Sequence, residues 1–469
     1  MELKAKLSEI YALICVALAF FLAEPSVCHC MNPPKEMTQS DSESTGHHMS
    51  DSKQSVFSPI ANVSRIAFKT DEIKRETMNA LEDCKWLAKS VNQFGLKMYP
   101  KLIRGDENLI FSPLSIFLSL ATAFEGARGQ SKDEIGKLLA IGQVAAPLHV
   151  MLADLTYQLR HSIPEEHGAL SLANGVWIHE FPDHIIHPTF EKVIADFYRA
   201  TVVTADFRSS PAQVAGQMND WIKEMTRGKI TDLISADRLR REQTVISILN
   251  AFYFKNMWLW PFETGRTKDE DFVCSGGSRI KVRMMHSSQR FRYMEEQDLQ
   301  GLELPYQGWE TSMMVFLPRK ADGLQEMEKS LTPETLGLWI SKFSQLPDVD
   351  VSFPKFGFKS RYGLLPTLKE MGMNISFGPG ADFSGMLEKK RPESPSISLF
   401  ITSMLHETRI DLNERGTEAA AATALSISAS APKPERKIFR ADHPFMFVIR
   451  HNRTGCILLM GRVTNPLAN

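Results

Sequence analysis

The sequence lacks the short motifs that mark the common classes of hydrolase, nucleotide-binding protein and metalloprotease. It contains no Gly-x-Ser-x-Gly turn, no phosphate loop ending in Gly-Lys-Ser or Gly-Lys-Thr, and no His-Glu-x-x-His. Its His-Glu pairs, at His179 and His406, are not followed by a second histidine at zinc spacing. We therefore expect no enzyme activity, no cofactor and no metal site, although a Ser/His/Asp triad assembled in space would leave no such motif.

The sequence also has few cysteines and almost no net charge. Six cysteines occur in 469 residues, which is too few for a dense disulfide framework and predicts at most one bridge. Cys456 lies in an apolar run and is expected to be a buried thiol. The net charge of −1 argues against bulk binding to nucleic acid or to an acidic membrane.

One apolar run, Ile10–Ala23, follows the basic residues Lys4 and Lys6. It is shorter than the ~20 residues that span a bilayer, and small residues suited to cleavage follow it. We interpret residues 1–30 as a signal peptide, with a membrane anchor as the alternative, and expect a secreted, extracellular protein.

The rest of the chain predicts a tail and one domain. Residues 31–80 are polar and lack periodicity, so we expect a flexible extension in which the pair His47-His48 binds no metal. From residue 81 to 469, helical patterns come first and many strands follow, which indicates one α+β domain. The long strand Val245–Trp258 is apolar on both faces and should be central in a sheet.

Three Asn-x-Ser/Thr sequences occur, at Asn62, Asn374 and Asn452. All three fall in the predicted tail or in predicted loops, so each is a candidate for glycosylation in a secreted protein.

The stretch Asn413–Ala431 fits neither of its obvious interpretations. Its alanine run favours a helix, but no apolar stripe accompanies it, and small or β-branched residues follow up to Pro432. A segment of this composition could form a surface loop and could also enter a sheet.

Several motifs, in order along the chain, resemble those of the serpins, the serine protease inhibitors. They include Phe111-Ser-Pro-Leu-Ser-Ile, Gly126-Ala-Arg-Gly, Asn250-Ala-Phe-Tyr-Phe-Lys, Asn413-Glu-Arg-Gly-Thr-Glu, Phe439-Arg-Ala-Asp-His-Pro-Phe and Gly461-Arg-Val-Thr-Asn-Pro. The resemblance covers about residues 81 to 466. More narrowly, the C-terminal loop spacing resembles that of antithrombin-type extracellular serpins.

The resemblance implies a serpin fold of about nine helices around three β-sheets, with an exposed reactive-centre loop at residues 414–438. It implies a monomeric, secreted inhibitor whose loop is cut by a serine protease and then enters the central sheet, which traps the protease in a covalent 1:1 complex. A non-inhibitory serpin, acting as a carrier or chaperone, is the alternative. The implied loop hinge comprises Glu414, Gly416, Thr417, Glu418, Ala419, Ala420, Ala421, Ala422 and Thr423.

The resemblance also implies roles for buried residues and for the scissile bond. Ser112, Ser115, Asn250 and His406 match the polar cluster where the central sheet opens, and Trp258 matches the tryptophan near the point of loop entry. At Glu407 the family commonly has a lysine, which leaves the local pairing there open.

Inhibitory serpins typically have seventeen residues from the conserved glutamate to the residue before the cut. With Glu414 as the first, the resemblance implies a cut at Ser430-Ala431, where a small side chain suits elastase-like proteases. Lys433 is the second candidate and suits trypsin-like enzymes, although Pro432 and Pro434 flank it.

A heparin-like polyanion is not favoured as a partner. The helix expected near residues 151–161 carries only Arg160 and His161. The basic residues Lys85, Lys89, Lys97, Lys101 and Arg104 are scattered along another segment, as on a solvated helix face.

Overall fold

Three large β-sheets, with helices packed against them, make up the domain in the computed structural model. The structure describes residues 59–142, 147–241, 244–343, 346–417 and 436–468. The contacts divide the chain into residues 1–65 and residues 66–469, and the strands described below belong to the second unit.

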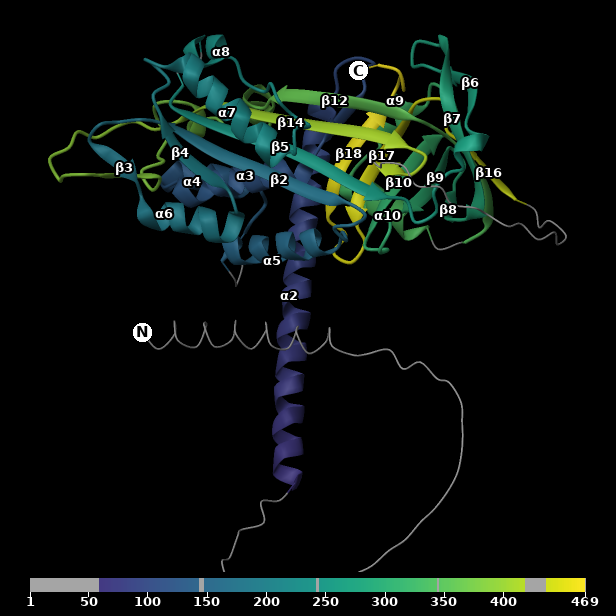
Figure 1. The fold of residues 1–469 in the computed structure, drawn as a ribbon, viewed down its shortest axis with the longest axis horizontal. Helices are drawn as coiled ribbons and strands as arrows, with labels where there is room; N and C mark the ends of the chain where they lie inside the picture. Colours follow the sequence, from purple (N-terminus) through teal and green to yellow (C-terminus); the bar gives the residue numbers. More distant parts are fainter. Residues whose placement is uncertain (1–58, 143–146, 242–243, 344–345, 418–435, 469) are drawn as a thin grey trace, which may run out of the picture. The chain divides into compact units, whose positions relative to one another are not determined.

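The central sheet holds six strands in the order β12-β14-β15-β5-β2-β4. Figure 1 shows β12, β14, β5 and β2 lying side by side. Its strands are β2 (Ala169–His179), β4 (Thr201–Ala205), β5 (Ile246–Met257), β12 (Phe356–Gly363), β14 (Ile401–Asn413) and β15 (Gly416–Thr417). Strand β5 is buried except for two half-buried residues near its end, and it has neighbours on both sides, so its predicted central position is confirmed.

A second six-stranded sheet has the order β1-β18-β17-β10-β9-β8. Its strands are β1 (Leu109–Phe111), β8 (Arg292–Glu295), β9 (Leu299–Pro305), β10 (Thr311–Pro318), β17 (Phe445–His451) and β18 (Ile457–Val463). A four-stranded sheet has the order β16-β11-β7-β6, built from β6 (Lys268–Val273), β7 (Arg279–Arg290), β11 (Asp348–Pro354) and β16 (Lys437–Arg440). The short strands β3 (His184–Ile186) and β13 (Leu387–Lys389) pair with each other.

Ten α-helices lie within the described residues. They are α2 (Pro59–Leu102), α3 (Pro113–Gly126), α4 (Gly129–Leu138), α5 (Leu148–His161), α6 (Pro188–Val193), α7 (Pro211–Met225), α8 (Ala236–Arg241), α9 (Leu324–Lys329), α10 (Pro333–Ser341) and α11 (Leu365–Glu370). Short π and 3-10 turns, η1 (Ile194–Tyr198), η2 (Thr264–Arg266) and η3 (Ile375–Phe377), complete the elements. The α+β class and the three β-sheets expected from the sequence are therefore confirmed, with ten α-helices among the described residues where about nine were expected.

Helix α3 begins where a polar cap meets an apolar sequence. Ser112 is its N-cap, its Oγ accepts a 3.1 Å hydrogen bond from the Ser115 amide, and Pro113 occupies the first helical position. The helix is buried nearly all round, because it lies between the central sheet and β18. This placement fixes Ser112 and Ser115 beneath the central sheet.

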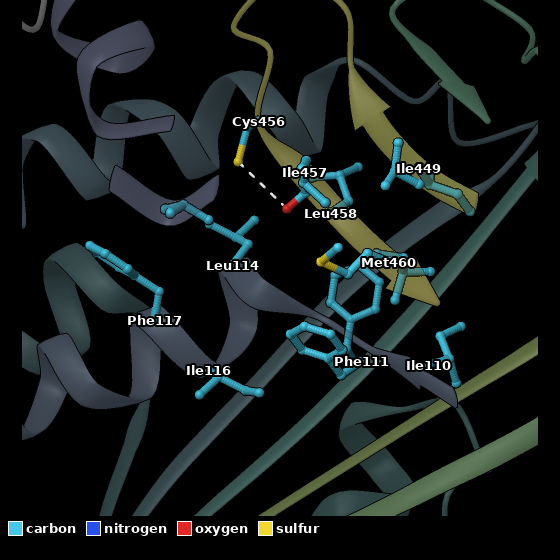
Figure 2. Close-up of a cluster of buried hydrophobic side chains, with 14 of the residues drawn as sticks. Ile110, Phe111, Leu114, Ile116, Phe117, Ile449, Cys456, Ile457, Leu458 and Met460 are labelled. Carbon is cyan, nitrogen blue, oxygen red and sulfur yellow. Dashed lines mark hydrogen bonds between the residues drawn. The ribbon is translucent and has the colours of Figure 1, made fainter. Parts of the chain in front are cut away.

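Helix α2 packs its apolar side chains into the core beside the β17–β18 hairpin. The Asn92 side chain bonds Gly455 O and Ile457 N, each at 2.9 Å, and so ties α2 to the start of β18. Figure 2 shows Cys456, Leu458 and Met460 of this region facing Phe111 and Leu114. Cys456 is a free buried thiol, as predicted, and burial raises its pKa. Cys84 and Cys274 are also free.

The N-terminal boundary differs from the prediction. Helix α2 begins at Pro59, so residues 59–80 are helical although we assigned them to the flexible extension. This stretch lacks an apolar stripe, but Ala, Glu, Lys, Arg and Met dominate its second half and favour a helix by intrinsic propensity. The predicted signal peptide (residues 1–30) lies outside the described residues. No helix in the part of the chain that the structure describes has the length and apolar character of a membrane span.

Candidate functional site: the seam of the central sheet

The central sheet contains one place where a further strand could enter. Strands β14 and β5 run parallel and pair from Ile401–Arg409 to Ile246–Tyr253. Beyond that ladder, β15 lies between them and pairs antiparallel with both. We call the β14–β5 ladder the seam. The two-residue strand β15 is thus the beginning of a strand in the middle of the sheet.

Beneath the seam lies the predicted cluster of Ser112, Ser115, Asn250 and His406, all completely buried. The Asn250 Nδ2 donates to Ser115 Oγ at 2.7 Å and to Ser115 O at 3.0 Å. The Ser112 amide donates to His406 Nε2 at 3.2 Å, and His406 Nδ1 bonds Asn250 Oδ1. His406 and Asn250 are direct partners across the seam, so the structure brings these four predicted residues together.

The hydrogen bonds determine the protonation state of His406. Its Nε2 accepts from the Ser112 amide, so its Nδ1 carries the proton and donates to Asn250 Oδ1. Complete burial lowers the pKa of His406 to about 3, which keeps the ring neutral near pH 7. The neutral ring therefore links the two seam strands without placing a charge in the core.

Three further residues complete this network and were not predicted. The Ser119 hydroxyl donates to Asn174 Oδ1 at 2.8 Å, and Asn250 Nδ2 also bonds Asn174 Oδ1. The Thr408 hydroxyl lies 2.7 Å from His406 Nε2. The available signal was an asparagine in the middle of the apolar strand Ala169–Ile178, since a buried amide needs partners.

At the end of the seam, Trp258 holds the start of β15. Its indole Nε1 donates to Asn413 O at 3.0 Å, and its backbone amide donates to Arg415 O at 2.7 Å. The indole stacks on Tyr306 with the ring centroids 4.5 Å apart. The Tyr306 hydroxyl lies 2.8 Å from the Thr417 hydroxyl, and Thr417 is completely buried. Trp258 therefore holds the start of β15 in place, and none of these bonds joins it to the His406 network.

Glu414 anchors the hinge in front of β15. Its carboxylate lies 2.9 Å from Lys355 Nζ, and its Oε1 accepts a 2.8 Å hydrogen bond from the Thr267 hydroxyl. Burial alone would raise the pKa of this carboxyl, but the hydrogen bonds from Lys355 and Thr267 bring it below its ordinary value. Glu414 is therefore ionised near pH 7 and holds one end of the loop to the domain.

Gly416 is required by close contact with β5. A Cβ atom at this position would lie 2.2 Å from Asn256 O and 2.7 Å from Met257 Cα. Its φ of +151° is also rare for residues with a side chain. Only glycine allows β15 to approach β5 closely enough to pair with it.

The charge at Glu407 has a partner in the structure. Arg361 Nε lies 2.5 Å from the buried Glu407 carboxylate, and the two residues are direct partners between β12 and β14. The carboxylate that stands where the family commonly has a lysine is thus paired with an arginine on the neighbouring strand.

The rest of the predicted loop lies outside the described residues. This applies to the hinge residues 418–423 and to both candidate cleavage positions, Ser430-Ala431 and Lys433. The described chain resumes at Arg436 and enters β16, which pairs parallel with β11. The loop is therefore tied to the central sheet at one end and to the four-stranded sheet at the other.

The three glycosylation candidates lie in different surroundings. Asn62 lies in α2 instead of in the tail that we predicted. Asn374 is exposed at the start of η3. The Asn452 Nδ2 donates to Trp309 O at 2.7 Å and to Ser312 Oγ at 2.8 Å, so a glycan on this nitrogen would require at least one of the two bonds to break.

Two of the basic residues considered for a polyanion have acidic neighbours. Lys85 pairs with Glu82 at 2.8 Å, and Lys101 lies 3.7 Å from Glu370. On α5, burial lowers the pKa of Arg160. In the described part of the chain, no group of three or more His, Cys, Asp or Glu side chains is arranged to hold a metal ion.

Comparisons with known proteins agree with this architecture. A serpin-like protein of Thermococcus kodakarensis is 35% identical over 380 residues, which cover 80% of this chain and 85% of that protein. The leukocyte elastase inhibitor of Equus caballus is 33% identical, with 81% and 99% covered. The native-state crystal structure of the thermophilic serpin tengpin matches with a TM-score of 0.72 and 28% identity, with 81% and 94% covered.

None of these three is named an antithrombin, so they lend no support to the narrower resemblance to antithrombin-type serpins. The model of one family, described as serpin (serine protease inhibitor), matches residues 89–466. The chain therefore belongs to the serpin family.

Proposed function

We propose that this protein inhibits a serine-type endopeptidase by presenting the loop at residues 418–435 as bait and inserting the cleaved loop into the seam. Membership of the family supports protease inhibition in general. The observation that carries the proposed insertion is β15, because the hinge residues Gly416 and Thr417 already lie between β14 and β5.

The two flanking strands are in register for a continuing strand. Leu412 and Asn256 both flank Thr417. Six positions earlier in each of these strands, His406 lies opposite Asn250. A strand that continues from Thr417 without a change of register would therefore place Thr423 between His406 and Asn250.

Alternate residues of the inserted strand share a face. Ala419, Ala421 and Thr423 would follow the buried Thr417 into the core, and none of them is charged or large. Glu418 would fall on the opposite face. The composition of the hinge thus suits a strand that has to pass between two packed neighbours.

Insertion would exchange one parallel ladder for two antiparallel ladders, which are slightly more stable per residue. Each new backbone hydrogen bond contributes about 1 kcal/mol net, whereas ordering a residue costs about 1–2 kcal/mol. These terms roughly cancel, so strain in the uncut sheet must supply much of the driving force, and the uncut form is kinetically trapped. About fifteen inserted residues would carry an attached protease roughly 50 Å.

We propose an elastase-like target. Cleavage at Ser430-Ala431 presents a small side chain, and relatives from Equus caballus and Xenopus tropicalis are named leukocyte elastase inhibitors. We further propose secretion directed by residues 1–30, a monomer, and a covalent 1:1 complex with an extracellular protease. Lys433 remains the second candidate for the cut.

The test incubates the protein with pancreatic elastase and with trypsin, followed by SDS gel electrophoresis. We expect an SDS-stable complex with elastase, and mass spectrometry of the released C-terminal peptide should give Ala431 as its first residue. A first residue of Pro434 would assign the cut to Lys433. Cleavage by every protease without any complex would refute inhibition and favour a carrier or chaperone.

The variant Thr417→Arg separates insertion from cleavage. Its guanidinium cannot occupy the buried position beside Tyr306, so we expect cleavage without a stable complex. Thr204→Arg, at an exposed position of β4 in the same sheet, is the matched control and should retain inhibition. Full inhibition by Thr417→Arg would contradict the insertion mechanism.

A further inference from the structure

A cavity of about 620 Å³ lies beside the ends of β9, β10 and β17, outside the seam. Its lining includes Trp260 and Trp309, three arginines (Arg292, Arg450 and Arg453) and the buried carboxylate of Glu303. This volume is within the range of about 300–1,000 Å³ that small-molecule sites occupy. None of these side chains takes part in the hydrogen bonds of the His406 network.

The apolar part of the cavity is formed by two perpendicular tryptophans. The Trp260 and Trp309 ring centroids are 5.3 Å apart with an interplanar angle of 87°. Trp309 is 56% exposed and has a φ of +63°, a left-handed conformation that a bulky residue rarely adopts. Asn452 holds it there by donating to Trp309 O at 2.7 Å. Backbone strain of this kind often occurs at functional sites, so this strained and exposed tryptophan suggests that the cavity has a function.

The polar part carries an excess of positive charge. Both acidic side chains of the lining have basic neighbours. Glu303 pairs with Arg292 at 3.7 Å, and Glu310 lies 3.4 Å from His451 Nε2. Among the described residues, Arg450 and Arg453 have no carboxylate within salt-bridge distance, and the buried Arg450 Nε has no hydrogen-bond partner. Burial lowers the pKa of the Arg450 guanidinium, because its charge is poorly solvated there. An anion would stabilise this charge.

We propose that this cavity binds a small planar aromatic carboxylate. Its ring lies against Trp260 and Trp309, and its carboxylate pairs with the guanidinium groups of Arg450 and Arg453. A guanidinium fork matches the geometry of a carboxylate, and aromatic rings contact each other favourably edge to face. The carboxylate supplies a direct ion-pair partner for these two arginines, because Glu303, which acts on Arg450 electrostatically, lies beyond salt-bridge distance of it.

The cavity is connected to the hinge through the segment Trp258–Phe262. The amides of Trp258 and Phe262 donate to Arg415 O and Glu414 O, both at 2.7 Å, while the Trp260 side chain between them lines the cavity. A ligand that fixes Trp260 would therefore also hold the hinge and slow loop entry. This second effect rests on the proposed function, whereas binding itself does not.

The probe is 2-naphthoate, titrated by calorimetry into the full chain produced without glycosylation. We expect one saturable site, and we expect the neutral alcohol 2-naphthalenemethanol to bind at least about tenfold more weakly, which corresponds to about 1.4 kcal/mol. Absence of a saturable site, or equal affinity for the alcohol, would overturn the proposal.

Two variants locate the site. Trp309→Gly removes the ring and suits the left-handed backbone, so it should bind at least about tenfold more weakly without losing thermal stability. Arg453→Gln should weaken 2-naphthoate by about tenfold, and Arg279→Gln, at an exposed arginine of β7, should not. If both Trp309→Gly and Arg453→Gln bind 2-naphthoate with unchanged affinity, the probe binds elsewhere and the proposed site is refuted. This outcome does not depend on the result of the protease assay.

Discussion

His406 combines two properties that rarely occur together. It is the one titratable side chain of the seam network, and it is completely buried. Its neutral ring bonds a backbone amide on one side and an asparagine on the other, so protonation would place an unpaired charge in the core. The residue that holds the seam closed is therefore sensitive to acid.

The stability of the uncut protein should fall as the pH decreases. The pKa of His406 is about 3 in the fold and about 6.5 in an unfolded chain, so the unfolded state binds more protons between these values. The contribution of His406 is thus complete above about pH 6.5 and decreases by up to about 1.4 kcal/mol per pH unit towards pH 3. His451, whose pKa burial lowers to about 4, acts in the same direction.

Thermal unfolding from pH 7 to pH 4 tests this prediction. In His406→Gln the midpoint should decrease less steeply with pH than in the wild type, because one of the buried histidines whose pKa burial lowers is gone. His161→Gln, at an exposed position on α5, should retain the wild-type slope. Identical slopes in all three proteins would show that His406 is not the responsible group.

At this scale the sequence predicted part of the site. Ser112, Ser115, Asn250 and His406 were identified through their resemblance to family motifs, and they do meet. Asn174, Ser119 and Thr408 were missed, since their roles depend on which strands become neighbours. An asparagine inside an apolar strand predicts a partner but does not identify it.

At the scale of elements, β15 is the part of the structure on which the proposed loop entry depends. Its two residues are held by Trp258, by Tyr306 and by both flanking strands. Its pairing with β5 depends on the absence of a side chain at Gly416. Blocking this pairing should act on loop entry while leaving the reactive bond intact.

Gly416→Val should convert much of the inhibitor into a substrate. The new Cβ would lie 2.2 Å from Asn256 O, so β15 would have to leave the sheet before the rest of the loop could follow it. Titration of elastase activity should show that severalfold more inhibitor is consumed per protease molecule. In Gly378→Val, where a Cβ meets nothing within 4 Å, the ratio should stay at the wild-type value. An unchanged ratio for Gly416→Val would exclude β15 as the point of entry.

Local pattern predicted the interior elements better than the edges. The central strand β5 and the β17–β18 hairpin follow directly from apolar runs. The edge strand β6 (Lys268–Val273) carries four charged residues in succession, so its sequence gives no apolar signal. Strand β16 pairs parallel with β11, and Arg436 forms an ion pair with Asp350 at 3.0 Å. Both contacts join residues far apart in the sequence, so the local pattern around β16 could not predict them.

At the scale of the whole molecule, the sequence predicted the α+β class and the serpin fold correctly. Helix α2 begins at Pro59, within the range assigned to the extension, and no apolar stripe in the sequence marks this start. Residues 418–435, whose proposed role is to change partners, match both loop and strand in composition, and this ambiguity is consistent with the proposed function.

Cleavage of the loop should stabilise the protein. If the cut loop enters the seam, the sheet gains a complete central strand, and the midpoint of thermal unfolding should rise by about 10 °C or more. Circular dichroism before and after limited elastase digestion measures this shift. Thr417→Arg, cut at the same bond, should show little gain. An equal gain in both proteins would mean that stabilisation does not depend on insertion.

The parallel pairing of β14 with β5 has a consequence beyond a single molecule. A ladder that can open for its own loop can also accept an extended segment of similar composition from a neighbouring copy. Intramolecular entry is favoured at low concentration because the hinge keeps its own loop close to the seam. Warming and crowding would shift this balance, so a seam that opens as proposed would also set an upper limit on the concentration at which the uncut protein stays monomeric.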